Sequence, residues 1–298
     1  MISVVAASYN HRQYIERCLG SIAAQDVDDI ELVWIDDHSA DGSFEVLTRL
    51  LDSRRYRGRF ARVIARRNGA NRGAHYTLNL GCRLATRPML SLVNTDDYYH
   101  PARLSTMLRS YDGQDHWFAF SNVVAVDDLE VPLPIDPAGS AVMFDPDRLV
   151  EATGSVSDAL LMRQIAASTG NFMLTRSLFD ALGGFSSLRY CHDWMLALNA
   201  CWFCEPVLVR ERLYFYRLHA TNSFRALSGS AQADTDTARR SLLRRIMLGI
   251  PPNPGLPSPQ RDPAGFWSAM ERAGLGDMAH SVLFPYSVST HMLDLPAS

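Results

Sequence analysis

The stretch Met89-Leu90-Ser91-Leu92-Val93-Asn94-Thr95-Asp96-Asp97 indicates how this chain folds and where it binds a ligand. Its apolar half, residues 89–93, predicts a short buried strand, and Pro101 suits the first turn of a following helix. Asp96 and Asp97 then stand at the carboxyl end of that strand, where open α/β sheets bind ligands. The two carboxylates repel each other, so a cation or donors from a ligand would stabilise them. The alternative is a turn that caps the helix after Pro101.

The residues before this stretch alternate between strand and helix patterns. Apolar runs predict strands at 2–7, 31–35 and 62–65, and helical periodicity predicts helices at 14–25, 41–51 and 74–85. This order implies a mostly parallel sheet that is covered by helices on both faces. Polar clusters follow three of the strands: Ser8-Tyr9-Asn10, Asp36-Asp37-His38-Ser39 and Asn94–Asp97. Because the carboxyl ends of parallel strands share one edge of a sheet, these clusters predict a single ligand crevice.

The rest of the chain is more mixed. It predicts strands at 117–120, 123–126, 206–209 and 213–216, and helices at 156–167, 176–182 and 191–202. The prolines between 251 and 259 predict a linker or an extended arm. The apolar residues beyond them predict packing against the main domain or a partner subunit.

Composition narrows the class of protein. The chain has 298 residues, is 47% hydrophobic and carries a formal net charge of -3, which gives no general case for nucleic-acid binding. No secretory opening or membrane-spanning stretch is recognisable, so we expect a soluble cytoplasmic protein that could still touch the inner face of a membrane. All 29 basic residues are arginine. This excludes a Schiff-base lysine, a P-loop lysine and a lysine general base.

Two local patterns have alternative interpretations. The odd number of cysteines predicts reduced thiols. Cys201 and Cys204 have zinc-like spacing, but no second pair of Cys or His residues follows at the spacing of a zinc finger, so buried apolar thiols are favoured. The arginines between residues 54 and 67 predict a solvated face. The alternative is contact with anionic lipid headgroups or with a lipid-diphosphate acceptor.

Taken in order, several motifs resemble those of the family 2 glycosyltransferases, which have the GT-A fold. The resemblance runs from Ile2 to about Phe224. The segments that carry it are Val4–Asn10, Asp36–Ser43, Asn71-Arg72-Gly73 with Asn79, Asn94–Asp97, Gly183-Gly184-Phe185 with His192-Asp193-Trp194, and Tyr216–His219 with Asn222-Ser223. The chain departs from the family's usual residues at four positions, which are Ala7 (usually proline), Leu78 (often basic), Asn94 (often aspartate) and His192 (usually glutamate).

The resemblance implies a site for Mn²⁺ or Mg²⁺. It implies that Asp97 is the main carboxylate ligand, that Asp96 holds the ribose or the metal, and that His219 approaches the metal or the diphosphate. Oxygen ligands suit both ions, and a histidine favours Mn²⁺. The alternative for His219 is an ordinary loop histidine.

The resemblance also implies a nucleoside-diphosphate sugar donor. Tyr9 would stack on the base, and Asp37 would accept the ring N–H that uracil and thymine have, so the donor would be linked to UDP or dTDP. Alternatives are packing at a strand end for Tyr9, a helix-capping turn for Asp37 and a surface position for Arg72. The donor-binding set that the resemblance implies is Ala7, Tyr9, Asn10, Asp37, Arg72, Asn79 and Asp96.

Asp193 is the catalytic base that the resemblance implies. A carboxylate that takes the proton of an acceptor hydroxyl, with no enzyme nucleophile, makes the reaction one in-line displacement that inverts the anomeric centre. The alternative for Asp193 is a helix N-cap. The acceptor is open and includes carbohydrate, lipid-linked and other hydroxyl compounds. Bacterial surface-polysaccharide or glycoconjugate synthesis is the setting that the family suggests.

We therefore expect a GT-A-type α/β domain at residues 1–224, with a donor half at 1–100 and an acceptor half at 101–224. The acceptor half would contribute a smaller mixed sheet. Residues 225–298 would form a helical extension with a proline-rich linker at 250–260, which braces the domain or mediates association such as a homodimer. The competing functions are a sugar-phosphate nucleotidyltransferase, which generally uses a glycine-rich loop and lysine, and a non-catalytic nucleotide-sugar or glycan-binding module.

Overall fold

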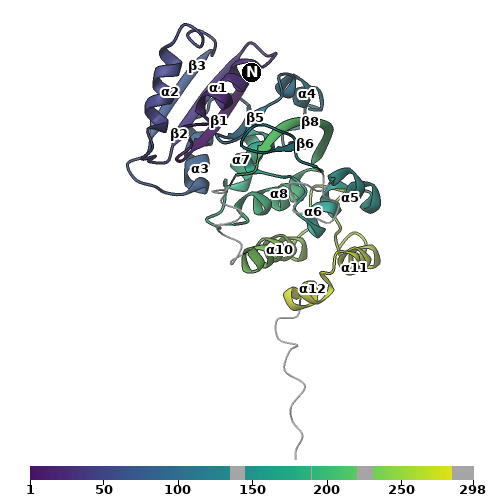
Figure 1. Cartoon of the computed structure of the whole chain (residues 1–298). Coiled ribbons are helices and arrows are strands. Elements are labelled where there is room, and N and C mark those ends of the chain that lie inside the picture. The colour runs from purple at the N-terminus through teal and green to yellow at the C-terminus, as the bar shows by residue number, and fades with distance from the viewer. Residues whose placement is uncertain (135–144, 189, 220–230, 284–298) are drawn as a thin grey trace, which may run out of the picture.

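An eight-stranded sheet forms the centre of the computed structural model, which describes residues 1–134, 145–188, 190–219 and 231–283 (Figure 1). The strand order is β3-β2-β1-β4-β7-β6-β8-β5. Strands β1 to β4 pair in parallel, β7 is antiparallel to β4 and β6, and β8 is parallel to β6 and antiparallel to β5. The strands are β1 (Ile2–Ser8), β2 (Ile30–Asp36), β3 (Arg62–Arg67), β4 (Met89–Asn94), β5 (Tyr98–Tyr99), β6 (Phe118–Val126), β7 (Phe172–Thr175) and β8 (Val207–Arg217).

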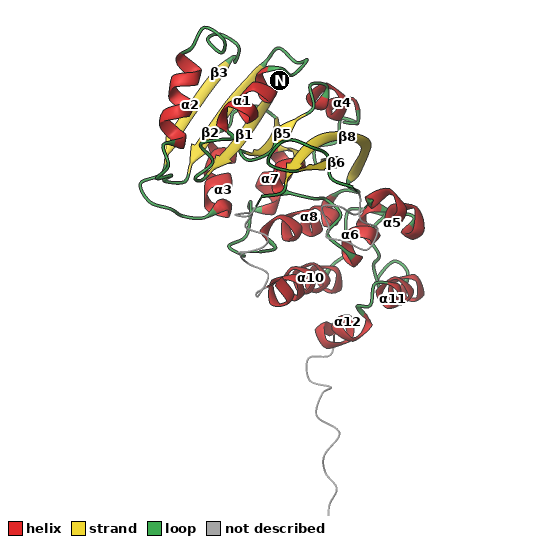
Figure 2. Ribbon diagram, in the orientation of Figure 1, coloured by secondary structure: helices red, strands yellow, loops and turns green. Residues whose placement is uncertain are grey.

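Helices cover the sheet and continue beyond one end of it (Figure 2). They are α1 (Ile15–Ala23), α2 (Ser43–Asp52), α3 (Ala74–Leu84), α4 (Arg103–Arg109), α5 (Pro146–Thr153), α6 (Val156–Met162), α7 (Arg176–Leu182), α8 (His192–Phe203), α10 (Ala231–Leu248), α11 (Pro263–Arg272) and α12 (Gly276–Leu283), with a 3-10 turn η1 at Thr169–Asn171. The parallel sheet and the alternation of strand and helix predicted for the first hundred residues are confirmed.

Alternate residues of the strands feed two separate cores, because successive side chains of a strand point to opposite faces. Val4 of β1 belongs to the core that includes Leu19 of α1, whereas Val5 belongs to the core that includes Leu78 of α3. A Cβ on Gly81 of α3 would lie 2.5 Å from Cγ1 of Val5. Glycine therefore lets α3 approach the sheet closely.

The second half of the chain differs from the predicted elements in several ways, which include the additional helix α5 and strand β7. The strands expected at 117–120 and 123–126 form one strand, β6, and those expected at 206–209 and 213–216 form one strand, β8. The pairing of β6 with β8 shifts register on both sides of Asn122, so an irregular ladder joins segments that look separate in the sequence. The acceptor-half strands extend the main sheet through the β4–β7 pairing. The helix expected at 156–167 ends at Met162, because Arg163 is extended.

The C-terminal helices pack against the main body of the protein. Leu242 of α10 and Phe266 of α11 belong to the same buried cluster as Leu78 of α3 and Leu198 of α8. The proline-rich segment contains neither helix nor strand, and buried Asn253 anchors it by donating to the carbonyl of Cys201. Of the two expectations for this region, the structure shows packing against the same chain.

Burial and contacts describe the two local patterns that had alternative interpretations. All five cysteines are buried and unpaired with one another, and within the described residues neither Cys201 nor Cys204 belongs to a metal-ligand cluster. In the arginine-rich stretch, Arg59 donates to three main-chain carbonyls, Arg62 pairs with Glu31, and Arg67 pairs with Glu45. Much of the basic stretch therefore serves the fold. No helix in the described part of the chain combines the length and apolarity needed to cross a bilayer.

Candidate active site

Hydrogen bonds join the three polar clusters that were predicted to share one crevice. The backbone N–H of Asn10 donates to Oγ of Ser39 at 2.8 Å, and the N–H of Ala40 donates to Oδ1 of Asn10 at 2.9 Å. The hydroxyl of Thr95 donates to the carbonyl of Ala7 at 3.3 Å. The clusters after β1, β2 and β4 therefore form one surface at the carboxyl ends of the strands.

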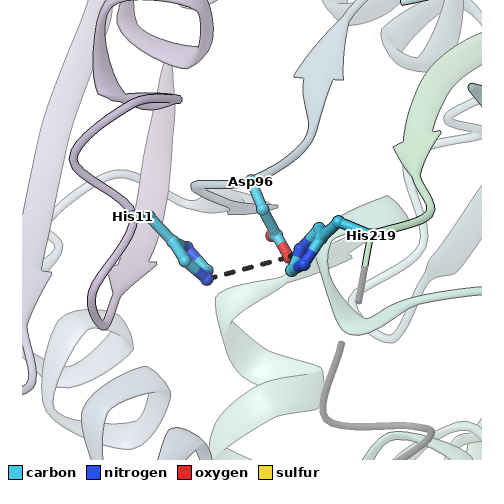
Figure 3. A group of neighbouring side chains, drawn as sticks. All are labelled: His11, Asp96 and His219. Atoms are coloured by element: carbon cyan, nitrogen blue, oxygen red, sulfur yellow. Dashed lines mark hydrogen bonds and ion pairs between the residues drawn. The ribbon is translucent and has the colours of Figure 1, made fainter. Parts of the chain in front are cut away.

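Asp96 lies between two histidines that are far from it in the sequence (Figure 3). Its Oδ2 is 3.1 Å from Nε2 of His219, which follows β8, and 3.8 Å from Nε2 of His11, which follows β1. One ligand atom from each of the three residues lies within 4.8 Å of the others. The His219 side chain is only 4% exposed.

This cluster fits a divalent cation. Oδ1 of Asp96 is buried and has no hydrogen-bond partner among the described residues, which is costly for a carboxylate oxygen unless a ligand completes the site. Burial acts to raise the pKa of Asp96, but the charges that His11 and His219 carry when they are protonated, and the hydrogen bond from His219, lower it overall. A carboxylate oxygen together with imidazole nitrogens is a donor set that suits Mn²⁺.

Asp97, which the resemblance implies is the main metal ligand, is not one of the three residues of this cluster. Its Oδ2 accepts a 2.6 Å hydrogen bond from the hydroxyl of Tyr214, and its Oδ1 accepts a 2.8 Å bond from the backbone N–H of Arg217. Burial, followed by the charge of Asp96, raises the pKa of Asp97 well above its ordinary value. Both oxygens thus face β8, which passes behind the aspartate pair.

Asp37 organises a loop. Its carboxylate accepts hydrogen bonds from the side chain of Asn68 and from the backbone N–H groups of Arg72 and Gly73. It does not cap α2, since that helix has Gly42 as its N-cap. Asp37 therefore holds the 68–73 loop before α3, whereas the guanidinium of Arg72 lies over the ring of Tyr76.

Tyr9 and Asn79 have contrasting positions. Tyr9 is 46% exposed at the end of β1, so it is not packed into the core. The Asn79 amide exchanges two hydrogen bonds with the backbone of Phe185, and this contact fixes α3 to the loop that follows α7. Asn79 thus positions the loop before the Asp193 segment.

Asp193 is in the first turn of α8, where a carboxylate interacts favourably with the helix dipole. The N-cap is Cys191, so the alternative of a capping role for Asp193 is not what the structure shows. Burial and then the charges of Asp97, Asp96 and Asp193 raise the pKa of Tyr216 well above its ordinary value. Tyr216 is therefore within electrostatic range of both the Asp96 cluster and Asp193.

The sequence did not single out His11, Thr95 or Arg217 as site residues. The buried Arg217 guanidinium donates to the carbonyls of Asp96 and Asp127 and to the Glu130 carboxylate, which ties the aspartate pair to the loop after β6. His11 follows directly after the motif that ends at Asn10, so its adjacency to a strand end was the available signal. The Asn222-Ser223 part of the closing motif lies outside the described residues.

Comparison with known proteins identifies the family. The sequence profile described as Glycosyl transferase family 2 matches residues 3–182. The chain belongs to glycosyl transferase family 2. Among curated proteins, the uncharacterized glycosyltransferase alr2836 of Nostoc sp. is 24% identical over 74% of this chain and 66% of its own length. The Escherichia coli UDP-Glc:alpha-D-GlcNAc-diphosphoundecaprenol beta-1,3-glucosyltransferase WfaP is 24% identical over 41% of this chain and 45% of its own. The chain thus spans two thirds or less of the length of these glycosyltransferases.

Solved structures support the GT-A-type fold of this family 2 chain. The S. aureus TarS structure with UDP-GlcNAc has a TM-score of 0.57 at 14% identity and covers 94% of this chain and 86% of that one. The mannosyltransferase PcManGT from Pyrobaculum calidifontis, in complex with GDP-Man and Mn²⁺, has a TM-score of 0.56 at 14% identity and covers 98% and 76%. At these identities the likeness concerns the fold, and the expected α/β architecture is confirmed.

Proposed function

We propose that this family 2 glycosyltransferase chain transfers a sugar from a nucleoside-diphosphate donor to an acceptor hydroxyl, with a divalent cation and with inversion. The observation that carries the proposal is the 3.1 Å contact between Asp96 and His219. It joins two motifs that are 123 residues apart, at the sheet edge where α/β folds bind ligands. The motifs of the first hundred residues form the donor side, and residues from about 101 to 224 supply the acceptor side.

Asp96 and His219 would bind the cation, and Asp97 would act as a positioning residue. A bound cation neutralises the negative charge that develops on the departing diphosphate. Asp97 holds Tyr214 and the start of the His219 segment, so its contribution is to fix the distance between Asp96 and His219. Oδ1 of Asp96 has no hydrogen-bond partner among the described residues, whereas both oxygens of Asp97 accept hydrogen bonds. This contrast supports the division of roles.

The donor base would lie on the exposed face of Tyr9. Asp37 acts on the donor through the 68–73 loop, because its oxygens already accept from Asn68, Arg72 and Gly73. In this arrangement the choice of base would rest with the loop that Asp37 holds. The solved relatives named above hold UDP-GlcNAc and GDP-Man, which supports a nucleotide-sugar donor in general.

Asp193 would remove the proton from the acceptor hydroxyl. A carboxylate suits this role. The charges of Asp96, Asp97 and Asp193 all act on Tyr216, which supports a base close to the cation side of the site. With one base and no enzyme nucleophile, direct displacement inverts the anomeric centre. The similarity to WfaP, a glucosyltransferase that acts on a diphosphoundecaprenol-linked sugar, supports a surface-polysaccharide setting with a lipid-linked or carbohydrate acceptor.

Calorimetric titration of UDP, dTDP, GDP and CDP, each with Mn²⁺ and with EDTA, tests the donor assignment. Cation-dependent binding of UDP or dTDP is expected. Binding of GDP alone would leave a transferase with a different base preference. If no nucleotide binds under either condition, the proposal of a nucleotide-sugar donor is wrong.

Substitution of Asp193 by asparagine tests the base. The variant should retain donor affinity but lose turnover, by about 10²- to 10⁴-fold for a general base. Asp180→Asn, on the exposed side of α7, is the matched control and should keep full turnover. A non-catalytic binding module would show donor binding and no transfer in the unmodified protein.

A further inference from the structure

We propose that His11 is a third protein ligand of the cation bound by Asp96 and His219, and that Thr95 sets the tautomer of His11 for this purpose. The inference rests on the proposed function, because it concerns the same cation. It adds a ligand from the first strand-end cluster, which the family motifs did not predict as a metal residue.

The hydrogen bonds of Thr95 determine which nitrogen of His11 carries the proton. The Thr95 hydroxyl has one proton and donates it to the carbonyl of Ala7 at 3.3 Å. The same oxygen is 2.8 Å from Nδ1 of His11, and while its proton lies toward Ala7 it accepts a hydrogen bond from Nδ1. A neutral imidazole with its proton on Nδ1 has its lone pair on Nε2.

The lone pair of His11 Nε2 faces a carboxylate oxygen. Nε2 is 3.8 Å from Oδ2 of Asp96, and two acceptors without a proton between them repel each other. A cation between Asp96, His11 and His219 removes this repulsion and fills the space among three ligand atoms that lie within 4.8 Å. Metal-binding histidines usually donate their other N–H to a polar partner, which is the role that Thr95 has here.

The two imidazoles are held from outside the cluster. The ring of Tyr14 is 6.0 Å from that of His11 and 5.4 Å from that of His219. The backbone N–H of His11 donates to Oγ of Ser43 at 3.0 Å, which fixes the turn after β1. The side chain of His11 is 21% exposed, so it reaches the ligand space without being free in solvent. These contacts preorganise His11 toward Asp96.

A site with two imidazoles discriminates between cations. Mg²⁺ prefers oxygen ligands, whereas Mn²⁺ and Co²⁺ accept imidazole nitrogen more readily. We therefore expect the protein to bind Mn²⁺ and Co²⁺ more tightly than Mg²⁺. The preference should diminish when His11 is replaced.

Electron paramagnetic resonance of Mn²⁺ added to the full chain tests the ligand directly. The unmodified protein should show coupling to two imidazole ¹⁴N nuclei, and His11→Ala to one. The affinity for Mn²⁺ should fall about 10- to 100-fold in His11→Ala. It should also fall in Thr95→Val, but by less. The affinity for Mg²⁺ should change much less in both variants. His116→Ala, which removes a histidine that packs on Phe203, is the matched control and should change neither readout.

The outcomes separate this inference from the proposed function. Unchanged nitrogen coupling and Mn²⁺ affinity in folded His11→Ala and His11→Gln would overturn the role of His11, and nucleotide binding would remain as support for the transferase. UDP binding with no Mn²⁺ coupling to any histidine would also overturn it. Coupling to two imidazoles without binding of any nucleotide would support the His11 site while the nucleotide-sugar proposal fails.

Discussion

The hydroxyl of Tyr214 donates a 2.6 Å hydrogen bond to Oδ2 of Asp97, and this bond distinguishes the two adjacent aspartates. It turns Asp97 toward β8, whereas Asp96 faces His219. The ring of Tyr214 also lies 5.2 Å from the guanidinium of the buried Arg103, which in turn donates to Asn171. A chain of buried polar contacts therefore supports the floor of the site.

Replacement of each aspartate by alanine should have a different effect. Asp96→Ala should lose Mn²⁺ affinity by more than about 10-fold with little loss of stability, because one Asp96 oxygen has no partner within the described residues. Asp97→Ala should lower the free energy of unfolding by about 1–3 kcal/mol, because it leaves the Arg217 N–H without its acceptor. Calorimetry and urea denaturation measure the two effects. If a folded Asp97→Ala variant loses Mn²⁺ binding and Asp96→Ala retains it, then Asp97 and not Asp96 is the metal ligand.

Gly170→Ala should distort the site by displacing Tyr214, whose hydroxyl donates to Asp97. A Cβ at this position would lie 2.0 Å from the Tyr214 hydroxyl and 2.5 Å from the backbone nitrogen of Asn94. Since that contact is too short, we expect a loss of about 1–3 kcal/mol in stability, with weaker Mn²⁺ binding as Tyr214 is displaced. Gly69→Ala, where a Cβ meets nothing within 4 Å, is the control. Equal thermal stability of the two variants would show that η1 moves freely.

Asp37→Asn should weaken the binding of UDP and the binding of CDP to the same extent. The carboxylate holds the N–H groups of Arg72 and Gly73, so its loss loosens the loop whatever base is bound. Calorimetric affinities of both nucleotides, in the variant and in the unmodified protein, give the comparison. A fall for UDP alone would instead favour direct reading of the ring N–H by Asp37.

Stability should depend on pH through Glu31, whose side chain is fully buried beside Arg62. Burial acts to raise the pKa of Glu31, but hydrogen bonds from Ser3, Thr86 and Arg62 outweigh it and hold the pKa below the ordinary value of 4.5. A lowered folded-state pKa means that the unfolded chain binds more protons in this range. The stabilisation is therefore complete above about pH 4.5 and is lost as the pH falls through the folded-state pKa.

Urea denaturation of the unmodified protein and of Glu31→Gln, from pH 7 downward, measures this contribution. The difference in unfolding free energy between the two proteins should be largest near neutral pH and should shrink as the solution becomes more acidic than pH 4.5. A difference that stays constant with pH would mean that the charge of Glu31 is not what stabilises the fold.

Local patterns in the sequence were sufficient for the donor half. Short apolar runs and helical periodicity predicted strands β1 to β4 and helices α1 to α3, because each element is specified by its own residues. The convergence of Asn10, Ser39 and Thr95 also followed from the sequence, since parallel strands bring their carboxyl ends together.

The roles of individual side chains depended on contacts between distant segments. Asp96 and Asp97 are equivalent in the local sequence, and only the position of β8, which supplies Tyr214 and Arg217, separates them. His11 joins Asp96 because β1 and β4 are neighbours in the sheet. The sequence by itself therefore determined the family, the parallel sheet and the edge at which the site lies. Tertiary structure decided which carboxylate faces the ligand, because side-chain direction follows from packing partners more than 100 residues away.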